Sequence, residues 1–160
     1  METQESHGET EVRSIDILLV EDNPSYIDLT RRALREIGGD DLRVEFAGDG
    51  MQALEIMRLE RSNPRLIISD ISMPGMGGLE MLRRIRDTPA TRYVPVVMLT
   101  SSARPSDIAA SYRFGAYGYA RRPMNFQSYI KTLADIIAYW LVINVSAPQG
   151  DPGIAPSAIR

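Results

Sequence analysis

The stretch from Arg65 to Leu79 constrains the fold more than any other part of the sequence. Its apolar run, Leu66 to Ile68, leads to Asp70, and a loop rich in Pro and Gly follows before Leu79 opens a helical pattern. A short apolar run bounded by turn residues is typical of a buried parallel strand. Open α/β sheets bind ligands just past the carboxyl ends of such strands, so Asp70 is a candidate functional residue. The alternative is a loop-capping Asp, since Asp often serves turns and caps.

This stretch belongs to a repeating pattern in which apolar strands alternate with amphipathic helices. We expect strands at Ile15–Val20, Leu42–Ala47, Leu66–Ile68, Val94–Leu99 and Tyr117–Arg121. Helical periodicity follows each one, beginning after Asn23, after Gly50, at Leu79, near Pro105 and near Asn125. Such alternation indicates right-handed βαβ units and a parallel sheet with helices on both faces. The sequence therefore predicts an α/β fold of the (βα)5 type, a doubly wound five-stranded parallel sheet.

Length and composition favour one domain. The chain has 160 residues, 44% of them hydrophobic, which is enough for one core. We expect a disordered leader at 1–13, the folded domain at 14–145 and a flexible tail at 146–160. The absence of cysteine excludes a disulfide framework and a thiolate metal site, and a cytoplasmic location is the simplest expectation.

Charge and hydropathy limit the partners. No apolar run approaches the ~20 residues of a membrane span, so we expect no membrane partner. The net charge of −3 offers no basic stripe, so we expect no nucleic-acid partner.

Polar side chains follow four of the predicted strands, and the carboxyl ends of parallel strands share one edge of a sheet. They are Glu21, Asp22, Asp70, Thr100 and Arg122. Three clustered carboxylates repel one another unless a cation neutralises them, and a donor set made only of oxygens suits Mg²⁺. A carboxylate beside Mg²⁺, with a hydroxyl and a guanidinium nearby, is suited to accept a phosphoryl group, with Asp70 as the nucleophile.

Asp70 also opens an Asp-x-x-Met-Pro-x-Met-x-Gly motif that ends at Gly78. With this motif, the acidic pair and Thr100, the chain resembles the receiver domain of two-component response regulators over about residues 15 to 144. The resemblance implies a flavodoxin-like receiver fold in which Asp70 accepts a phosphoryl group. It implies that Glu21, Asp22, Asp70 and the backbone carbonyl of Ser72 bind Mg²⁺.

The same resemblance assigns roles at the fourth and fifth strands. Thr100 matches the switch hydroxyl, and Tyr119 matches the switch aromatic. Pro123 matches a proline that usually follows a cis peptide bond. An acyl phosphate is expected to act through Thr100 and Tyr119 on the face formed by the fourth helix, the fifth strand and the last helix.

Arg122 departs from the family, which has lysine at this position. Two explanations are open. One is a chain-wide preference for arginine that keeps the charge, since Lys131 is the only lysine among 18 basic residues. The other is an altered site, because arginine is a planar fork and lysine a compact point charge. The second explanation leaves open a phosphorylation-independent pseudo-receiver or adaptor.

An enzyme is a weaker alternative. Phosphohydrolases with an Asp nucleophile use a second acid two residues later, where this chain has Ser72. We therefore expect no enzyme activity beyond the protein's own aspartyl phosphorylation and dephosphorylation.

Three segments resemble the stand-alone response regulators associated with phytochromes: Glu21–Pro24, Arg121–Phe126 and Tyr139–Val142. This resemblance implies a histidine kinase of bacteriophytochrome type as the phosphoryl donor.

The last helix carries more apolar residues than one face needs. Its main stripe, from Phe126 to Trp140, is expected to face the sheet. Tyr129, Ile136 and Ile143 recur every seven residues beside this stripe. We expect a homodimer contact formed by these three residues and Trp140.

Overall fold

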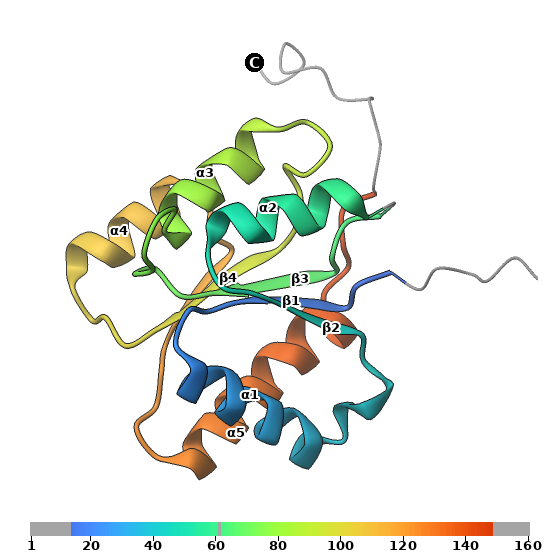
Figure 1. Ribbon diagram of the computed structural model, residues 1–160, viewed down its shortest axis with the longest axis vertical. Coiled ribbons are helices and arrows are strands. Elements are labelled where there is room, and N and C mark those ends of the chain that lie inside the picture. Colours follow the sequence, from blue (N-terminus) through green and yellow to red (C-terminus); the bar gives the residue numbers. More distant parts are fainter. Residues whose placement is uncertain (1–13, 61, 149–160) are drawn as a thin grey trace, which may run out of the picture.

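The computed structural model describes residues 14–60 and 62–148, and these form the predicted (βα)5 fold (Figure 1). Five parallel strands make one sheet in the order β2-β1-β3-β4-β5. The strands are β1 (Ile17–Val20), β2 (Val44–Ala47), β3 (Leu66–Ser69), β4 (Val96–Thr100) and β5 (Gly118–Arg121). The expected leader, 1–13, and most of the expected tail, 149–160, lie outside the described residues.

Five helices cover the two faces of this sheet. They are α1 (Pro24–Ile37), α2 (Gly50–Leu59), α3 (Gly78–Asp87), α4 (Pro105–Arg113) and α5 (Phe126–Ala138). Figure 1 shows α1 and α5 on one face, and α2, α3 and α4 on the other. None of the described helices is long and apolar enough to cross a lipid bilayer.

Each face of the sheet has its own hydrophobic core, and β1 contributes to both. Ile17 and Leu19 pack with residues of α1 and α5, whereas Leu18 and Val20 pack with residues of α2 and α3. All four side chains are buried. Burial on both faces explains why the central strands are continuous apolar runs rather than alternating ones.

The helix ends follow the local sequence signals. Asn23 caps α1 by accepting a hydrogen bond from the Ser25 N–H at 2.9 Å, and Pro24 takes the first helical position. Gly38 ends this helix with φ of 83°, a left-handed conformation that glycine adopts without steric cost. Asn125 caps α5 through the Ser128 N–H at 2.8 Å. Both caps lie at the carboxyl edge of the sheet, so α1 and α5 begin beside the candidate site.

The last helix differs from the expectation of two separate apolar faces. Tyr129 is only 2% exposed and lies in the core between α1 and α5, whereas Ile143 is 66% exposed. Residues seven apart drift by about 20° per heptad on an α-helix. A π-helical turn, Tyr139–Ile143, shifts the last residues further. Tyr129 is therefore a core residue and does not belong to the expected dimer surface.

Candidate functional site

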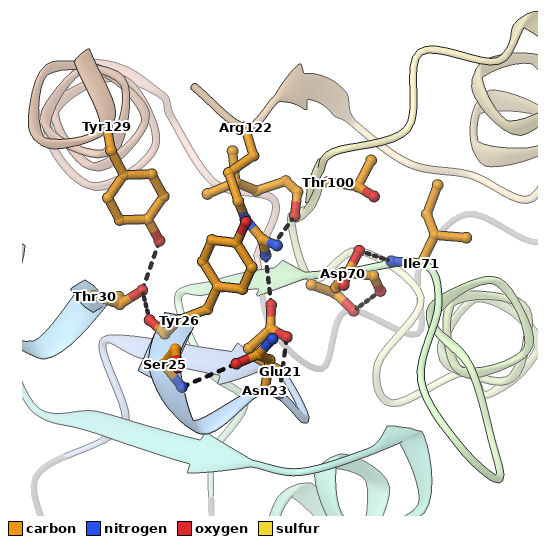
Figure 2. A network of polar contacts seen from close by, with 12 residues as sticks. Glu21, Asn23, Ser25, Tyr26, Thr30, Asp70, Ile71, Thr100, Arg122 and Tyr129 are labelled. Atoms are coloured by element: carbon orange, nitrogen blue, oxygen red, sulfur yellow. Dashed lines mark hydrogen bonds and ion pairs between the residues drawn. The ribbon is translucent and has the colours of Figure 1, made fainter. Parts of the chain in front are cut away.

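The predicted site residues meet at the carboxyl edge of the sheet (Figure 2). Glu21 and Asp22 follow β1, Asp70 follows β3, Thr100 ends β4 and Arg122 follows β5. Backbone hydrogen bonds extend the sheet to this edge. The Asp70 N–H donates to the Val20 carbonyl at 3.0 Å, and the Arg122 N–H donates to the Thr100 carbonyl at 2.8 Å.

Three carboxylates form a compact cluster at this edge. One oxygen each from Glu21, Asp22 and Asp70 lies within 4.8 Å of the others. Glu21 is buried, Asp70 is partly buried and Asp22 is exposed, so the cluster opens toward solvent on one side. Burial raises the pKa of the Glu21 carboxyl, and the Arg122 cation opposes that shift. An all-oxygen, anionic donor set that is open to water fits a hard divalent ion such as Mg²⁺.

Arg122 turns inward and pairs with one member of this cluster. Its Nη2 donates to Glu21 Oε2 and, at 3.3 Å, to the Leu99 carbonyl. The Glu21 and Arg122 side chains are only 4% and 6% exposed. Burial by itself lowers the pKa of Arg122, but attraction to Glu21 and Asp70 outweighs burial and raises that pKa. The guanidinium is therefore a permanent buried cation beside the three carboxylates.

The loop after β3 presents Asp70 in one orientation. Asp70 Oδ1 accepts a hydrogen bond from the Ile71 N–H at 2.7 Å, and the Ser69 hydroxyl donates to the Asp70 carbonyl at 2.8 Å. Gly78 begins α3 against this loop. A Cβ at Gly78 would lie 2.0 Å from the Asp70 carbonyl oxygen, a distance no side chain tolerates. The glycine of the motif is therefore required because the helix passes so close to the acceptor loop.

On the α4 side of Asp70, Thr100 and Tyr119 each make fewer polar contacts than Arg122 makes on the α1 side. Thr100 is buried, and its hydroxyl accepts a long hydrogen bond, 3.4 Å, from the Ser102 N–H. Tyr119 is partly buried, and its hydroxyl donates to the Ser102 carbonyl at 2.8 Å. Thr100 and Tyr119 are thus connected through the backbone of Ser102.

Sequence reasoning did not assign Tyr26, Thr30 or Tyr129 to the site. The Tyr26 ring lies against the Arg122 guanidinium, with 3.8 Å between the ring centroid and Cζ. The Thr30 hydroxyl donates to the Tyr26 carbonyl at 2.8 Å and lies 2.6 Å from the Tyr129 hydroxyl. Burial raises the pKa of Tyr129. Tyr26 was detectable in the sequence, because it lies in the first turn of a helix that begins just after the acidic pair.

Two expectations about individual residues have different outcomes. The expected cis bond before Pro123 is wrong, since no cis peptide bond occurs among the described residues. The Arg122–Pro123 bond takes the trans form, which is the more stable isomer of an X–Pro bond. The expected binding of Mg²⁺ by the Ser72 backbone carbonyl stays a prediction; Ser72 is exposed in the loop after Asp70.

Comparison with protein families identifies the chain. A family model described as "Response regulator receiver domain" matches residues 17–134. The chain belongs to this family. It is a receiver-domain response regulator of two-component signalling.

Named relatives agree with this assignment. The chain is 36% identical over 134 residues to the "Probable methanogenesis regulatory protein FilR2" of Methanothrix harundinacea (strain 6Ac). The match covers 81% of this chain and 86% of that protein.

Two solved structures are also similar. The phosphorylated cyanobacterial phytochrome response regulator RcpA has a TM-score of 0.76 at 29% identity, covering 85% of this chain and 100% of that one. The bacteriophytochrome response regulator RtBRR has a TM-score of 0.66 at 35% identity, and the match covers 85% of this chain and 86% of that one.

Proposed function

We propose that this protein is a single-domain response regulator that accepts a phosphoryl group from a histidine kinase on Asp70, with Mg²⁺ as cofactor. The observation that carries the proposal is the cluster of Glu21, Asp22 and Asp70, whose oxygens lie within 4.8 Å of one another beside a buried arginine. Its receiver-family relatives are signalling proteins rather than classical enzymes, so the expected chemistry is limited to its own Asp70.

The geometry of Asp70 suits nucleophilic attack. Oδ1 is held by the Ile71 N–H, which leaves Oδ2 to attack phosphorus. An Oδ2–P bond forms as the P–N bond to the donor histidine breaks, and the electron pair of that bond stays on the imidazole. Water later cleaves the acyl phosphate and regenerates the carboxylate.

Mg²⁺ would be held by Glu21, Asp22, Asp70 and the backbone carbonyl of Ser72. When bound, it would neutralise negative charge on the transferring phosphoryl oxygens. Thr100, at the end of β4, would donate a hydrogen bond to the phosphoryl group. Tyr119 then follows Thr100 inward, which changes the α4-β5-α5 face that contacts the downstream partner.

Incubation with acetyl phosphate and Mg²⁺ tests this function directly. Intact-mass analysis should show the gain of one phosphoryl group in the wild type and none in Asp70→Asn. Asp87→Asn is a matched control, because Asp87 is an exposed acid at the end of α3. Absence of an adduct, or an equal adduct on Asp70→Asn, would refute the proposal.

One observation favours a second candidate, a phosphorylation-independent adaptor. Arg122 pairs with Glu21 in the structure, not with Asp70. An adaptor of this kind would bind its partner equally well with and without acetyl phosphate and would tolerate Asp70→Asn. A pull-down of the partner with wild type and Asp70→Asn separates the two functions.

The likeness to RcpA and RtBRR supports a phytochrome-type histidine kinase as the donor. We propose that this phosphotransfer takes place in the cytoplasm. A phosphotransfer assay with such a kinase tests this choice of donor. The wild type should be phosphorylated, and Asp70→Asn should not.

Exposed apolar residues support a homodimer formed by the end of the last helix. Ile143 is 66% exposed and Val142 80% exposed, next to partly buried Trp140 and Ile136. Light scattering at tens of micromolar should show a dimer, and Ile143→Asp should show a monomer. A wild-type monomer at this concentration excludes the homodimer.

A further inference from the structure

Both carboxylate oxygens of Glu21 already have hydrogen-bond donors within the protein. Oε1 accepts from the Asn23 N–H at 3.1 Å, and Oε2 accepts from Arg122. The Asn23 contact comes from the backbone at the start of α1 and is set by the turn after β1. The Arg122 contact comes from a side chain that can move. A divalent ion bound by Glu21 therefore competes with Arg122 for the same carboxylate.

The Tyr26 ring contacts the Arg122 side chain that pairs with Glu21. The ring covers the guanidinium at 3.8 Å, a distance at which a cation is attracted to the face of an aromatic ring. The same ring lines an open pocket with Arg122, Pro123 and Met124, and the Arg122 and Glu21 side chains beside it are only 6% and 4% exposed. Tyr26 is held in turn by its helix, where its carbonyl accepts from Thr30.

We propose that Tyr26 is a positioning residue that holds Arg122 on Glu21 and thereby weakens the binding of Mg²⁺ to the carboxylate cluster. This inference rests on the proposed function, because it concerns the ion of the same site. Arg122 supplies a positive charge beside the three carboxylates through its pair with Glu21. Glu21 would turn from Arg122 to a bound ion, and the guanidinium would then be free to turn toward Asp70 and a phosphoryl group there.

The proposal depends on the guanidinium fork. Arginine offers a planar face to the Tyr26 ring while its Nη2 donates to Glu21 in the same position. Lysine has a rounder, more strongly hydrated head group, which combines these two contacts less well. The guanidinium of Arg122 and the ring of Tyr26 are thus parts of one arrangement.

Calorimetric titration with Mg²⁺ in the absence of any phosphoryl donor tests the proposal. Removing the ring in Tyr26→Leu should weaken the Arg122–Glu21 pair and tighten Mg²⁺ binding by about five- to thirty-fold, the range between an exposed and a desolvated cation–ring contact. Tyr26→Phe retains the ring and should restore the wild-type affinity.

Two controls separate positioning from a general loosening of α1. Phe126→Leu removes another arginine–ring contact of α1, that of Arg32 over Phe126 at 4.3 Å, without touching Glu21. It should leave the Mg²⁺ affinity unchanged. In an Arg122→Met background the ring has no cation to hold, so adding Tyr26→Leu should change the affinity no further.

The results distinguish this inference from the proposed function. Equal Mg²⁺ affinity in wild type and Tyr26→Leu, or an equal gain in Phe126→Leu, overturns the inference even if Asp70 is phosphorylated. If Arg122→Met does not fold, the comparison of Tyr26→Leu, Tyr26→Phe and Phe126→Leu still decides it. If neither the wild type nor any variant binds Mg²⁺ and Asp70 gains no phosphoryl group, both proposals fail.

Discussion

Asp70 lies between two regions that are held in different ways. On the α1 side, the buried Arg122 contacts Glu21, the Leu99 carbonyl and the Tyr26 ring. On the α4 side, the Thr100 hydroxyl has one long hydrogen bond, and Tyr119 bonds to a loop carbonyl. The first region contains a desolvated ion pair, and the hydrogen bonds of Thr100 and Tyr119 in the second are neutral and part-buried.

This difference suggests a division of labour around the acceptor. Losing one partner of a buried ion pair costs several kcal/mol, so the α1 side resists rearrangement unless another cation replaces Arg122. A single neutral hydrogen bond contributes only about 0.5–1.5 kcal/mol, so the α4 side rearranges at low cost. A conformational switch needs two states separated by a few kcal/mol, which fits the α4 side.

The largest effect is expected from breaking the ion pair. Arg122→Met leaves the Glu21 carboxylate buried without its cation and should lower the free energy of unfolding by about 3–5 kcal/mol, measured in urea without divalent ions. Adding Mg²⁺ should restore part of the loss, because the ion binds the native state.

The matched control is Arg104→Met on the α4 side. The Arg104 side chain is 74% exposed and pairs with Asp107 at 3.1 Å, so its loss should cost at most about 1 kcal/mol. Equal losses in the two variants would show that the two regions are not held differently.

Tyr129→Phe tests the network behind the ion pair. It removes the buried contact with the Thr30 hydroxyl and should cost about 1 kcal/mol in the same unfolding experiment. Thr30 keeps its bond to the Tyr26 carbonyl, so the loss stays moderate. Tyr112→Phe, at an exposed tyrosine of α4, should be neutral, and a similar loss there would argue against a specific role for Tyr129.

Tyr119→Phe makes the equivalent change on the α4 side. The Ser102 carbonyl loses its donor but lies in a part-buried loop that water reaches, so we expect a loss of about 0.5 kcal/mol, smaller than for Tyr129→Phe. A larger loss than in Tyr129→Phe would reverse the comparison.

Thr100→Val should have the smallest effect on stability, within about 0.5 kcal/mol. Valine has the same shape, and the replaced hydroxyl accepts only one 3.4 Å bond. Its effect should appear only after phosphorylation. Amide NMR shifts of Tyr119 should respond to acetyl phosphate in the wild type and much less in Thr100→Val. An unchanged response would remove Thr100 from the switch.

Much of the site was predictable because topology by itself brings the strand ends together. Glu21, Asp70 and Arg122 are far apart in the sequence, yet each follows a parallel strand of one sheet, and parallel strands share a carboxyl edge. The helix ends at Asn23 and Gly38 were predictable for a more local reason, since caps depend on neighbouring residues alone.

The sequence by itself therefore determined the order of elements, the parallel sheet and the edge at which the carboxylates gather. Only the tertiary structure decided that Arg122 pairs with Glu21 under the ring of Tyr26, and that Tyr129 lies inside the core. The physical reason is that sequence patterns specify structure more coarsely than individual side-chain contacts require. Alternating apolar patterns specify faces and edges, whereas the choice among three nearby carboxylates depends on rotamers and helix rotation, which only the packed structure specifies.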